Sequence, residues 1–528
     1  MKRSDQLRAV AFVLAVALLS TATGATQQPG PYQVGYTVKH EYDHSRTFQR
    51  PSDYAGNRIE GEIARPLQIS VWYPAEPAPD IEPIAYEEYL WADLTRTDFT
   101  PPTGEDRRHY TDNLARVLAM EYRVERERFD SVSSQIARAF TRKARAFRDA
   151  APAEGSFPLL IHMSGYNASP RHHAGLFESL AGHGFVVAAL PSMGMYSESI
   201  DNERLSIQVQ ARDMDFAFDR MRGFPNVDPH RVGALGMSWG GMSNILFAQQ
   251  NFNVDAVVTL DGAVTMVEEL KLLESLPGYD VKAFRPAYLQ LMVAPEEAAF
   301  RPKDLRFFEQ LLYSDAWMVQ FSGVTHDDFG CEYSDAIRSL AETDTAVATR
   351  REAFARLLRE YILAFFDTYL EDDPTAEAGL QSMFDEANIN TDLLARTARK
   401  TAHPAPPTQA ELMEIVRTQN PQRALEIYLS ARQVDSLVDL SLASRFMGSL
   451  YMEAFQAEEY DRALDICRAW QHANPADIGP LFSMGRAYRR MADSASAIDC
   501  YRRILESAGD ERHRTSALEA IEELGGDN

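Results

Sequence analysis

The chain has 528 residues, of which 45% are hydrophobic and 25% are charged. This length is too great for one compact domain and predicts roughly two to four domains with ordinary buried cores. The formal net charge of −24 argues against nucleic acid and anionic membrane surfaces as partners.

Residues 1–25 have the pattern of a secretory signal peptide. Lys2, Arg3 and Arg8 form a positive region, residues 9–19 form an apolar run, and small residues follow it. The alternative is a membrane anchor, but this run is too short to span a bilayer comfortably. We therefore expect an exported mature protein, either periplasmic or secreted.

The three cysteines, Cys331, Cys467 and Cys500, are scattered along the chain. Their spacing matches neither a disulfide framework nor a zinc motif. Cys467 and Cys500 are free to pair after export, but buried free thiols are the simpler interpretation.

Between about residues 66 and 322, short apolar runs alternate with helical patterns, which is typical of an α/β fold. Several runs are almost continuously apolar, as expected for strands of a mostly parallel sheet covered on both faces. The expected strands are 67–74, 158–163, 184–190, 231–237, 254–260, 287–293 and 317–323. Residues 206–222 are expected to form an amphipathic helix, and residues 354–370 a helix that closes a domain spanning residues 26–372.

Residues 80–155 interrupt this alternation with a helical, arginine-rich insertion. Its apolar stripe consists of Val132, Ile136, Phe140, Ala144 and Phe147. Such a stripe usually packs on the body of a domain, and an inserted segment of this kind can also act as a lid over a substrate pocket. Packing on the body is the favoured interpretation, and a lid is compatible with it.

The composition changes after residue 372. Residues 373–408 contain proline-rich stretches that are typical of a linker, and residues 409–528 are helical. The spacing of a tetratricopeptide repeat is matched by Ala463, Gly485, Tyr488, Ala497 and Tyr501. We therefore expect an all-α domain of tetratricopeptide-like repeats with a groove for a protein partner, and unrelated helical hairpins remain the alternative.

Residues 236–240 read G-M-S-W-G and fit G-x-S-x-G, a pattern that places a serine on a sharp turn between a strand and a helix. An expected strand precedes Ser238 and a helical pattern follows it. Gly236 and Gly240 allow the strand and the helix to approach each other across the turn. Ser238 is therefore a candidate nucleophile.

A serine nucleophile needs a base that is oriented by an acid, in the chain order Ser, Asp or Glu, His. His326 is the only histidine between Ser238 and the expected linker, and it follows the last expected strand. The acid remains open between Asp261, at the end of an earlier strand, and Glu296 or Glu297, after the next one. Asp261 lies in a tight L-D-G turn, which favours it.

An oxyanion hole needs two backbone N–H groups. We expect one from Trp239, directly after the nucleophile, and the other from Tyr166, where Gly165 permits a tight turn. Three nearby histidines lack the spacing of metal ligands and are expected to be structural or surface residues: His162, His172 and His173.

These motifs resemble the α/β-hydrolase superfamily over about residues 60–370. The segments that carry the resemblance are QISVWYPA, FPLLIHMSGYNAS, LAGHGFVVAAL, VDPHRVGALGMSWGG, VVTLDGA and THDDF. Their order is similar to that in platelet-activating-factor acetylhydrolase-like esterases, a pattern that implies Asp261 as the acid.

The run SGYNAS followed by LAGHGFVVAA is also similar to cutinase-like polyester hydrolases, which implies a tyrosine donor at Tyr166 and an acid one strand later. That later turn reads Pro295-Glu296-Glu297 here, which favours Asp261. The loop after His162 also departs from the usual H-G-x-G oxyanion pattern of the superfamily.

The resemblance implies an α/β-hydrolase fold and an exported serine hydrolase that cleaves a carboxylic ester without a metal or organic cofactor. Ser238 would attack, His326 would transfer the proton and Asp261 would orient the imidazole. The expected substrate is a small-molecule, lipid-like or polyester-like ester. Two alternatives stay open: a peptidase or amidase on the same triad, and a non-catalytic scaffold that binds protein.

Overall fold

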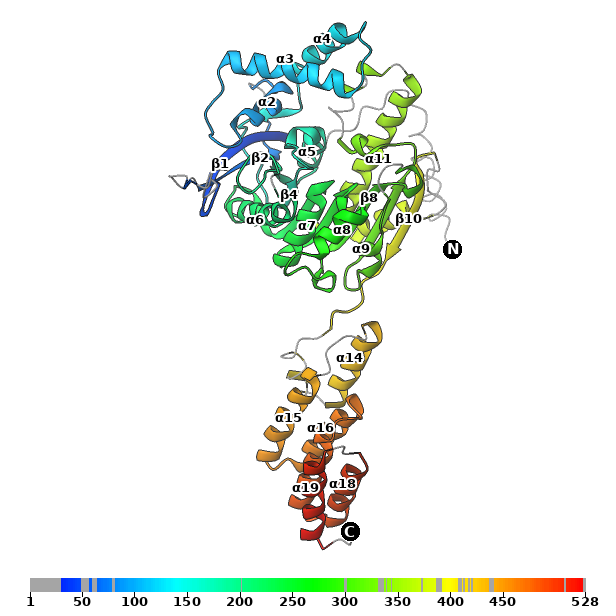
Figure 1. Cartoon of the computed structure of the whole chain (residues 1–528). Coiled ribbons are helices and arrows are strands. Elements are labelled where there is room, and N and C mark those ends of the chain that lie inside the picture. The colour runs from blue at the N-terminus through cyan, green and yellow to red at the C-terminus, as the bar shows by residue number, and fades with distance from the viewer. Residues whose placement is uncertain are drawn as a thin grey trace, which may run out of the picture. The chain divides into compact units, whose positions relative to one another are not determined.

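A computed structural model of the chain describes residues 30–48, 57–58, 64–77, 81–200, 202–298, 302–330, 337–338, 340–342, 344–371, 374–385, 392–406, 411, 414–415, 418, 421–435, 441–507 and 510–525. Contacts within the chain divide it into two compact units, residues 1–401 and residues 402–528 (Figure 1). The predicted signal peptide and Cys331 lie outside the described residues. No helix among the described residues is long and apolar enough to cross a membrane.

The first unit is built on a mixed sheet, which has ten strands within the described residues, in the order β10-β9-β8-β7-β6-β4-β5-β2-β1-β3. The strands are β1 (Gln33–Thr47), β2 (Ala64–Ala75), β3 (Ala146–Arg148), β4 (Phe157–Met163), β5 (Val186–Leu190), β6 (Val227–Met237), β7 (Val254–Leu260), β8 (Ala287–Val293), β9 (Ala316–Phe321) and β10 (Leu394–Lys400). The run from β5 through β4 to β9 is parallel, whereas β2 and β10 join it antiparallel. The predicted α/β fold with a mostly parallel sheet is confirmed.

Helices cover both faces of this sheet (Figure 1). The core on one face includes α5 (Ala174–Gly182) and α11 (Thr345–Leu370). The core on the other face includes α6 (Glu203–Met221), α7 (Trp239–Gln250), α8 (Val267–Glu274) and α9 (Arg306–Gln310). Every residue of β4, β5, β8 and β9 is buried, which accounts for their continuous apolar sequences.

Short 3₁₀ turns lie in the loops that connect the strands and helices of the first unit. They are η2 (Ala92–Thr95), η3 (Pro170–His173), η4 (Ala263–Thr265), η5 (Val281–Ala283), η6 (Pro295–Glu297) and η7 (His326–Gly330). Because the parallel strands share one direction, the turns after β4, β6, β7, β8 and β9 gather at the carboxyl edge of the sheet, where α/β folds bind ligands.

The insertion between β2 and β4 contains α2 (Glu87–Trp91), α3 (Gly104–Glu121) and α4 (Phe129–Phe140). The predicted stripe is correct only in part, because Val132 and Ile136 are buried but the helix ends at Phe140. The chain turns back there, since Ala144 donates its N–H to the Ile84 carbonyl at 2.8 Å. Phe147 belongs to β3, which pairs with β1 at the edge of the sheet.

The predicted linker, residues 373–408, is not free of secondary structure, and the first unit extends into it as far as residue 401. It contains α12 (Pro374–Met383) and strand β10, which pairs antiparallel with β9. Most side chains of β10 are exposed or half-buried, as on the edge of a sheet. An edge strand needs no apolar run, so the sequence LARTARK carried no strand pattern.

The second unit is entirely helical in the part that the structure describes, as predicted. Its helices are α14 (Pro421–Val434), α15 (Ser441–Gln456), α16 (Tyr460–Ala473), α17 (Gly479–Arg490), α18 (Ser494–Ser507) and α19 (Glu511–Glu523). Ala463 and Ala497 are fully buried, and a Cβ at Gly485 would lie 2.7 Å from the Tyr501 ring. Small residues therefore stand where helices pack closely. Cys467 and Cys500 are buried free thiols in this core.

Candidate active site

Ser238 lies on a strained turn between β6 and α7. Its backbone angles are φ 52° and ψ −119°, a conformation that a residue with a side chain rarely adopts. The Ser238 N–H donates to the Leu260 carbonyl at 3.0 Å, and the Ser238 carbonyl accepts from Gly241 at 3.0 Å and from Ala263 at 2.8 Å. Three backbone hydrogen bonds therefore hold the strained conformation.

The glycines on either side of Ser238 are required by close backbone approach. A Cβ at Gly240 would collide with the Met163 carbonyl of β4, and a Cβ at Gly236 would lie 2.6 Å from the Gly240 carbonyl oxygen. Helix α7 thus lies so close to β4 and β6 that side chains are excluded at both positions. The G-x-S-x-G pattern has a steric reason here.

Asp261 directly follows β7 and is 1% exposed. Its Oδ2 lies 2.7 Å from His326 Nδ1, while Oδ1 accepts from Lys303 Nζ at 2.6 Å and from the Val293 N–H at 3.1 Å. Burial alone raises the pKa of this carboxyl. The His326 hydrogen bond and the Lys303 charge outweigh burial, so that the pKa of Asp261 lies below its ordinary value.

His326 opens the 3₁₀ turn η7 after β9, and its side chain is 37% exposed. A carboxylate only accepts hydrogen bonds, so the contact with Asp261 requires the proton on Nδ1. In the neutral imidazole, the other ring nitrogen, Nε2, is then an acceptor. The imidazole has the tautomer that a general base needs.

The turn that carries His326 is held at several points. Asp328 accepts from the Thr325 N–H at 2.6 Å, and its other oxygen forms ion pairs with Arg338 at 2.6 Å and Arg351 at 3.0 Å. His173 Nε2 lies 3.1 Å from the Phe329 carbonyl, so it donates from the loop after β4. These contacts fix the turn without touching the imidazole.

The alternative acids lie apart from this pair. Glu296 and Glu297 are exposed on η6, after β8. The Glu297 carboxylate accepts from the Gly323 N–H at 2.6 Å. Of the three candidates, Asp261 is the one whose carboxylate contacts His326.

The expected oxyanion donors lie close to Ser238. Trp239 is the first residue of α7, where a backbone N–H has no partner within the helix. A Cβ at Gly165, the neighbour of Tyr166, would lie 3.5 Å from Ser238 Cβ. The rings of Tyr166 and Trp239 pack edge to face at 5.3 Å, so the two donor-bearing segments touch.

Ser238 and His326 line one cavity of about 1100 Å³. The insertion supplies part of its wall, which is partly aromatic and apolar. Lining residues from this segment are Tyr86, Leu118, Glu121, Tyr122, Arg123 and Phe140. The insertion therefore packs on the body through its stripe and also shapes the cavity.

The three histidines near the oxyanion loop are buried or half-buried, and burial lowers the pKa of each. The pKa falls to about 4 for His173 and about 3 for His172, and well below its ordinary value for His162. These rings are therefore neutral at physiological pH. Among the described residues, no group of three His, Cys, Asp or Glu side chains could hold a metal ion.

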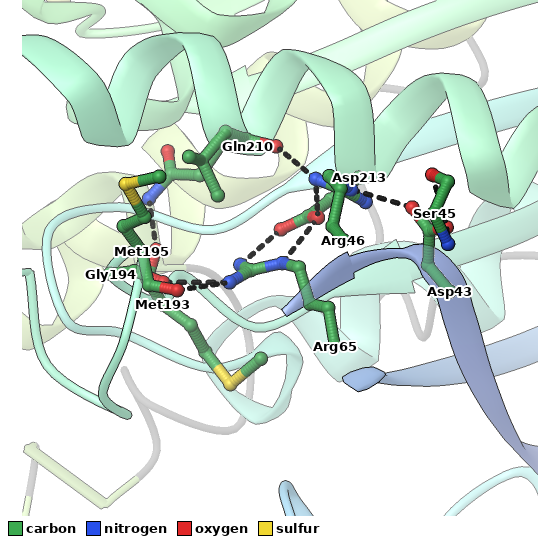
Figure 2. A network of polar contacts seen from close by, with 10 residues as sticks. Asp43, Ser45, Arg46, Arg65, Met193, Gly194, Met195, Gln210 and Asp213 are labelled. Carbon is green, nitrogen blue, oxygen red and sulfur yellow. Dashed lines mark hydrogen bonds and ion pairs between the residues drawn. The ribbon is translucent and has the colours of Figure 1, made fainter. Parts of the chain in front are cut away.

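A buried ion network fixes the loop that follows β5 (Figure 2). Arg65 binds both oxygens of Asp213 at 2.7 and 2.6 Å, and Arg46 adds a contact to Asp213 at 2.9 Å. Arg65 also donates to the carbonyls of Gly194 and Met195 in this loop. The network therefore ties β1 and β2 to α6 and to the loop.

Replacing Asp213 by alanine is expected to lower the free energy of unfolding by about 3–5 kcal/mol, because Arg65 would stay buried without a counter-charge. Chemical denaturation followed by circular dichroism measures this change. Asp219→Ala, on the exposed side of the same helix, is the matched control and should change stability by less than about 0.5 kcal/mol. Equal effects of the two substitutions would contradict the assigned role of the network.

Sequence reasoning missed Lys303 and the pair Arg65–Asp213. Lys303 is 42 positions from Asp261, and Arg65 is 148 positions from Asp213. A charged residue inside an apolar strand, as Arg65 is in ARPLQISVWYPA, is a usable signal for a buried ion pair. The segment around Lys303 carries no such signal.

No family model and no curated protein sequence matches the chain. Among solved structures, the chain is similar to a ferulic acid esterase from Streptomyces cinnamoneus, with 21% sequence identity and a TM-score of 0.43. The match covers 71% of this chain and 98% of that one. We assign the fold from the sheet order and the strand directions, and we assign the candidate site from the geometry of its residues.

Proposed function

We propose that this chain is a serine hydrolase that cleaves a carboxylic ester through an acyl-enzyme intermediate. The observation that carries the proposal is the 2.7 Å contact between His326 Nδ1 and the buried Asp261 carboxylate. It leaves Nε2 as a base in the cavity that Ser238 also lines. The strained backbone of Ser238 supports the same reading, because strain of this kind gathers at functional sites.

In the proposed reaction, Ser238 Oγ attacks the ester carbonyl while its proton passes to His326 Nε2. The buried Asp261 carboxylate stabilises the imidazolium, and the backbone N–H groups of Trp239 and Tyr166 stabilise the oxyanion. The imidazolium then protonates the leaving alcohol. Water, deprotonated by His326, releases the acid and restores Ser238.

The cavity supports an ester with a bulky, partly apolar portion. Its volume of about 1100 Å³ exceeds what a short acyl group fills, and aromatic side chains such as Tyr122 and Phe140 form part of the wall. A series of p-nitrophenyl esters of increasing acyl length tests this, with the matching p-nitroanilides as amide counterparts. Turnover of esters but not anilides is the expected result, whereas faster anilide cleavage would favour a peptidase or amidase.

We also propose that the protein is exported from the cytoplasm and that it binds a protein partner. Residues 1–25 support export to the periplasm or the outside, and the helical second unit supports a protein partner. Mass spectrometry of the mature N-terminus after expression in the native host tests the first point. An intact residue 1 on the mature protein would contradict export by signal cleavage.

A chain that ends at residue 402 is expected to keep the kcat of the full protein on a small soluble ester. All candidate catalytic residues precede residue 330, and the first unit ends at residue 401. A chain that ends at residue 385 is the control. It lacks β10, leaves the edge of β9 unpaired, and should show a lower Tm.

Steady-state kinetics with circular dichroism as a check on folding measures both truncated chains. A folded but inactive protein ending at residue 402 would mean that the second unit completes the site. That result would contradict the proposal that the first unit alone contains the complete active site.

A further inference from the structure

Lys303 is buried beside the candidate acid. Its side chain is 2% exposed, and its Nζ lies 2.6 Å from Asp261 Oδ1 and 3.2 Å from Thr265 Oγ1. Lysine is almost never buried without a partner, because removing an ammonium group from water is costly. The buried position of Lys303 is therefore not explained by a contribution to surface solubility.

The backbone around Lys303 is fixed as well as its charge. Lys303 forms an isolated β-bridge with Met266, and the Asp304 N–H donates to the Thr265 carbonyl at 2.7 Å. The segment is thereby attached to η4, which directly follows the Asp261 turn. These two backbone contacts anchor the segment that holds the Lys303 ammonium beside Asp261.

The two oxygens of Asp261 have different partners. Oδ2 contacts His326 Nδ1, whereas Oδ1 accepts hydrogen bonds from Lys303 Nζ and the Val293 N–H. Lys303 therefore orients the carboxylate without displacing the imidazole. It also places an ammonium group on the side of the carboxylate that faces away from His326.

That charge acts on the protonation of His326. A buried carboxylate on its own favours the imidazolium form strongly, and a cation bound to the same carboxylate weakens this preference. Other ionisable groups near His326 lie on its own turn, on η3, on the helical segments beside η7 and on the insertion. Among the described residues these are Asp327, Asp328, Arg171, His172, His173, Arg338, Glu342, Arg351, Glu121 and Arg123, with Glu297 on η6. None of them contacts the Asp261 carboxylate in the described structure.

We propose that Lys303 is a positioning residue: its buried ammonium holds the Asp261 carboxylate so that Oδ2 faces His326 Nδ1, and it partly offsets the negative charge that the carboxylate presents to the imidazole. This inference rests on the proposed function, in which His326 is the base. Lys303, Asp261 and His326 are then joined by direct contacts, and Ser238 lines the same cavity as His326.

Three substitutions of Lys303 test the proposal in the full-length protein. Lys303→Met removes the charge and the hydrogen bond, Lys303→Gln removes the charge but keeps a donor, and Lys303→Arg keeps the charge. Lys271→Met, on the exposed face of α8, is the matched control. The pH dependence of kcat/KM on a p-nitrophenyl ester is measured for each variant.

The acid limb of the profile is expected to move up by about one pH unit in the Met and Gln variants, and to stay in place in the Arg variant and the control. A residue that only stabilises the fold would lower Tm and kcat but leave the limb where it is. If Lys303→Met fails to fold, Lys303→Gln carries the test. An unmoved limb in Lys303→Gln overturns the proposal.

A second readout separates this inference from the proposed function. In a Ser238→Ala background, the titration of the His326 ring is followed by NMR, with the signal assigned by its loss in His326→Gln. The midpoint is expected to rise by about one pH unit when Lys303→Gln is added. A raised midpoint, together with an unsubstituted protein that turns over no ester, would overturn the proposed function alone. An unchanged midpoint would overturn the role of Lys303.

Discussion

Replacing Ser238 by alanine is expected to lower kcat for ester hydrolysis by about six orders of magnitude, as loss of the nucleophile does in a serine triad. The substitution removes one oxygen from a turn whose conformation is held by backbone hydrogen bonds to Leu260, Gly241 and Ala263. The fold should therefore survive, and the Tm should change little. Steady-state kinetics on a p-nitrophenyl ester, with circular dichroism as a check on folding, measures the effect.

The control for this prediction is Ser134→Ala, a serine exposed on α4. It should keep full activity. Purified Ser238→Ala protein that retains several per cent of the original kcat would remove Ser238 from the role of nucleophile.

Replacing Asp261 by asparagine is expected to lower kcat by about four orders of magnitude. The amide cannot stabilise an imidazolium, and it no longer requires the proton on His326 Nδ1, so the wrong tautomer becomes available. It also leaves Lys303 without its anion, so part of the loss in this protein comes from stability. A Tm measured in parallel separates the two effects.

Glu296→Gln and Glu297→Gln are the matched controls, because both side chains are exposed on the turn after the next strand. Each should change kcat less than about threefold, since neither carboxylate contacts His326 and surface substitutions are usually mild. A severe loss in Glu296→Gln together with a mild one in Asp261→Asn would move the acid to the later strand.

The central strands were predictable because they are buried on both faces. Strands β4 to β9 appear in the sequence as apolar runs, and each expected strand from residue 67 onward corresponds to a strand of the structure with small changes at its ends. The edges were not predictable in this way. β1 and β10 carry many exposed polar side chains, so no apolar period distinguishes them from loops.

In the candidate site, too, some residues are predictable from a local sequence pattern and others are not. Ser238 stands in a local pattern whose glycines have steric reasons nearby in the fold, so the sequence alone marks it. The choice between Asp261 and the glutamates depends on which strand end reaches His326, a distance that no local pattern encodes. Lys303 depends on a contact across 42 positions, and only the folded chain reveals it.

Covalent labelling with a fluorophosphonate, followed by mass spectrometry of the modified peptide, tests the central claim most directly. An activated serine reacts with this reagent because a neighbouring base removes its proton and an oxyanion hole stabilises the adduct. We predict stoichiometric modification of the full-length protein at Ser238, and none in His326→Gln under the same conditions. Modification at another serine, or no modification of the folded protein, would contradict the account.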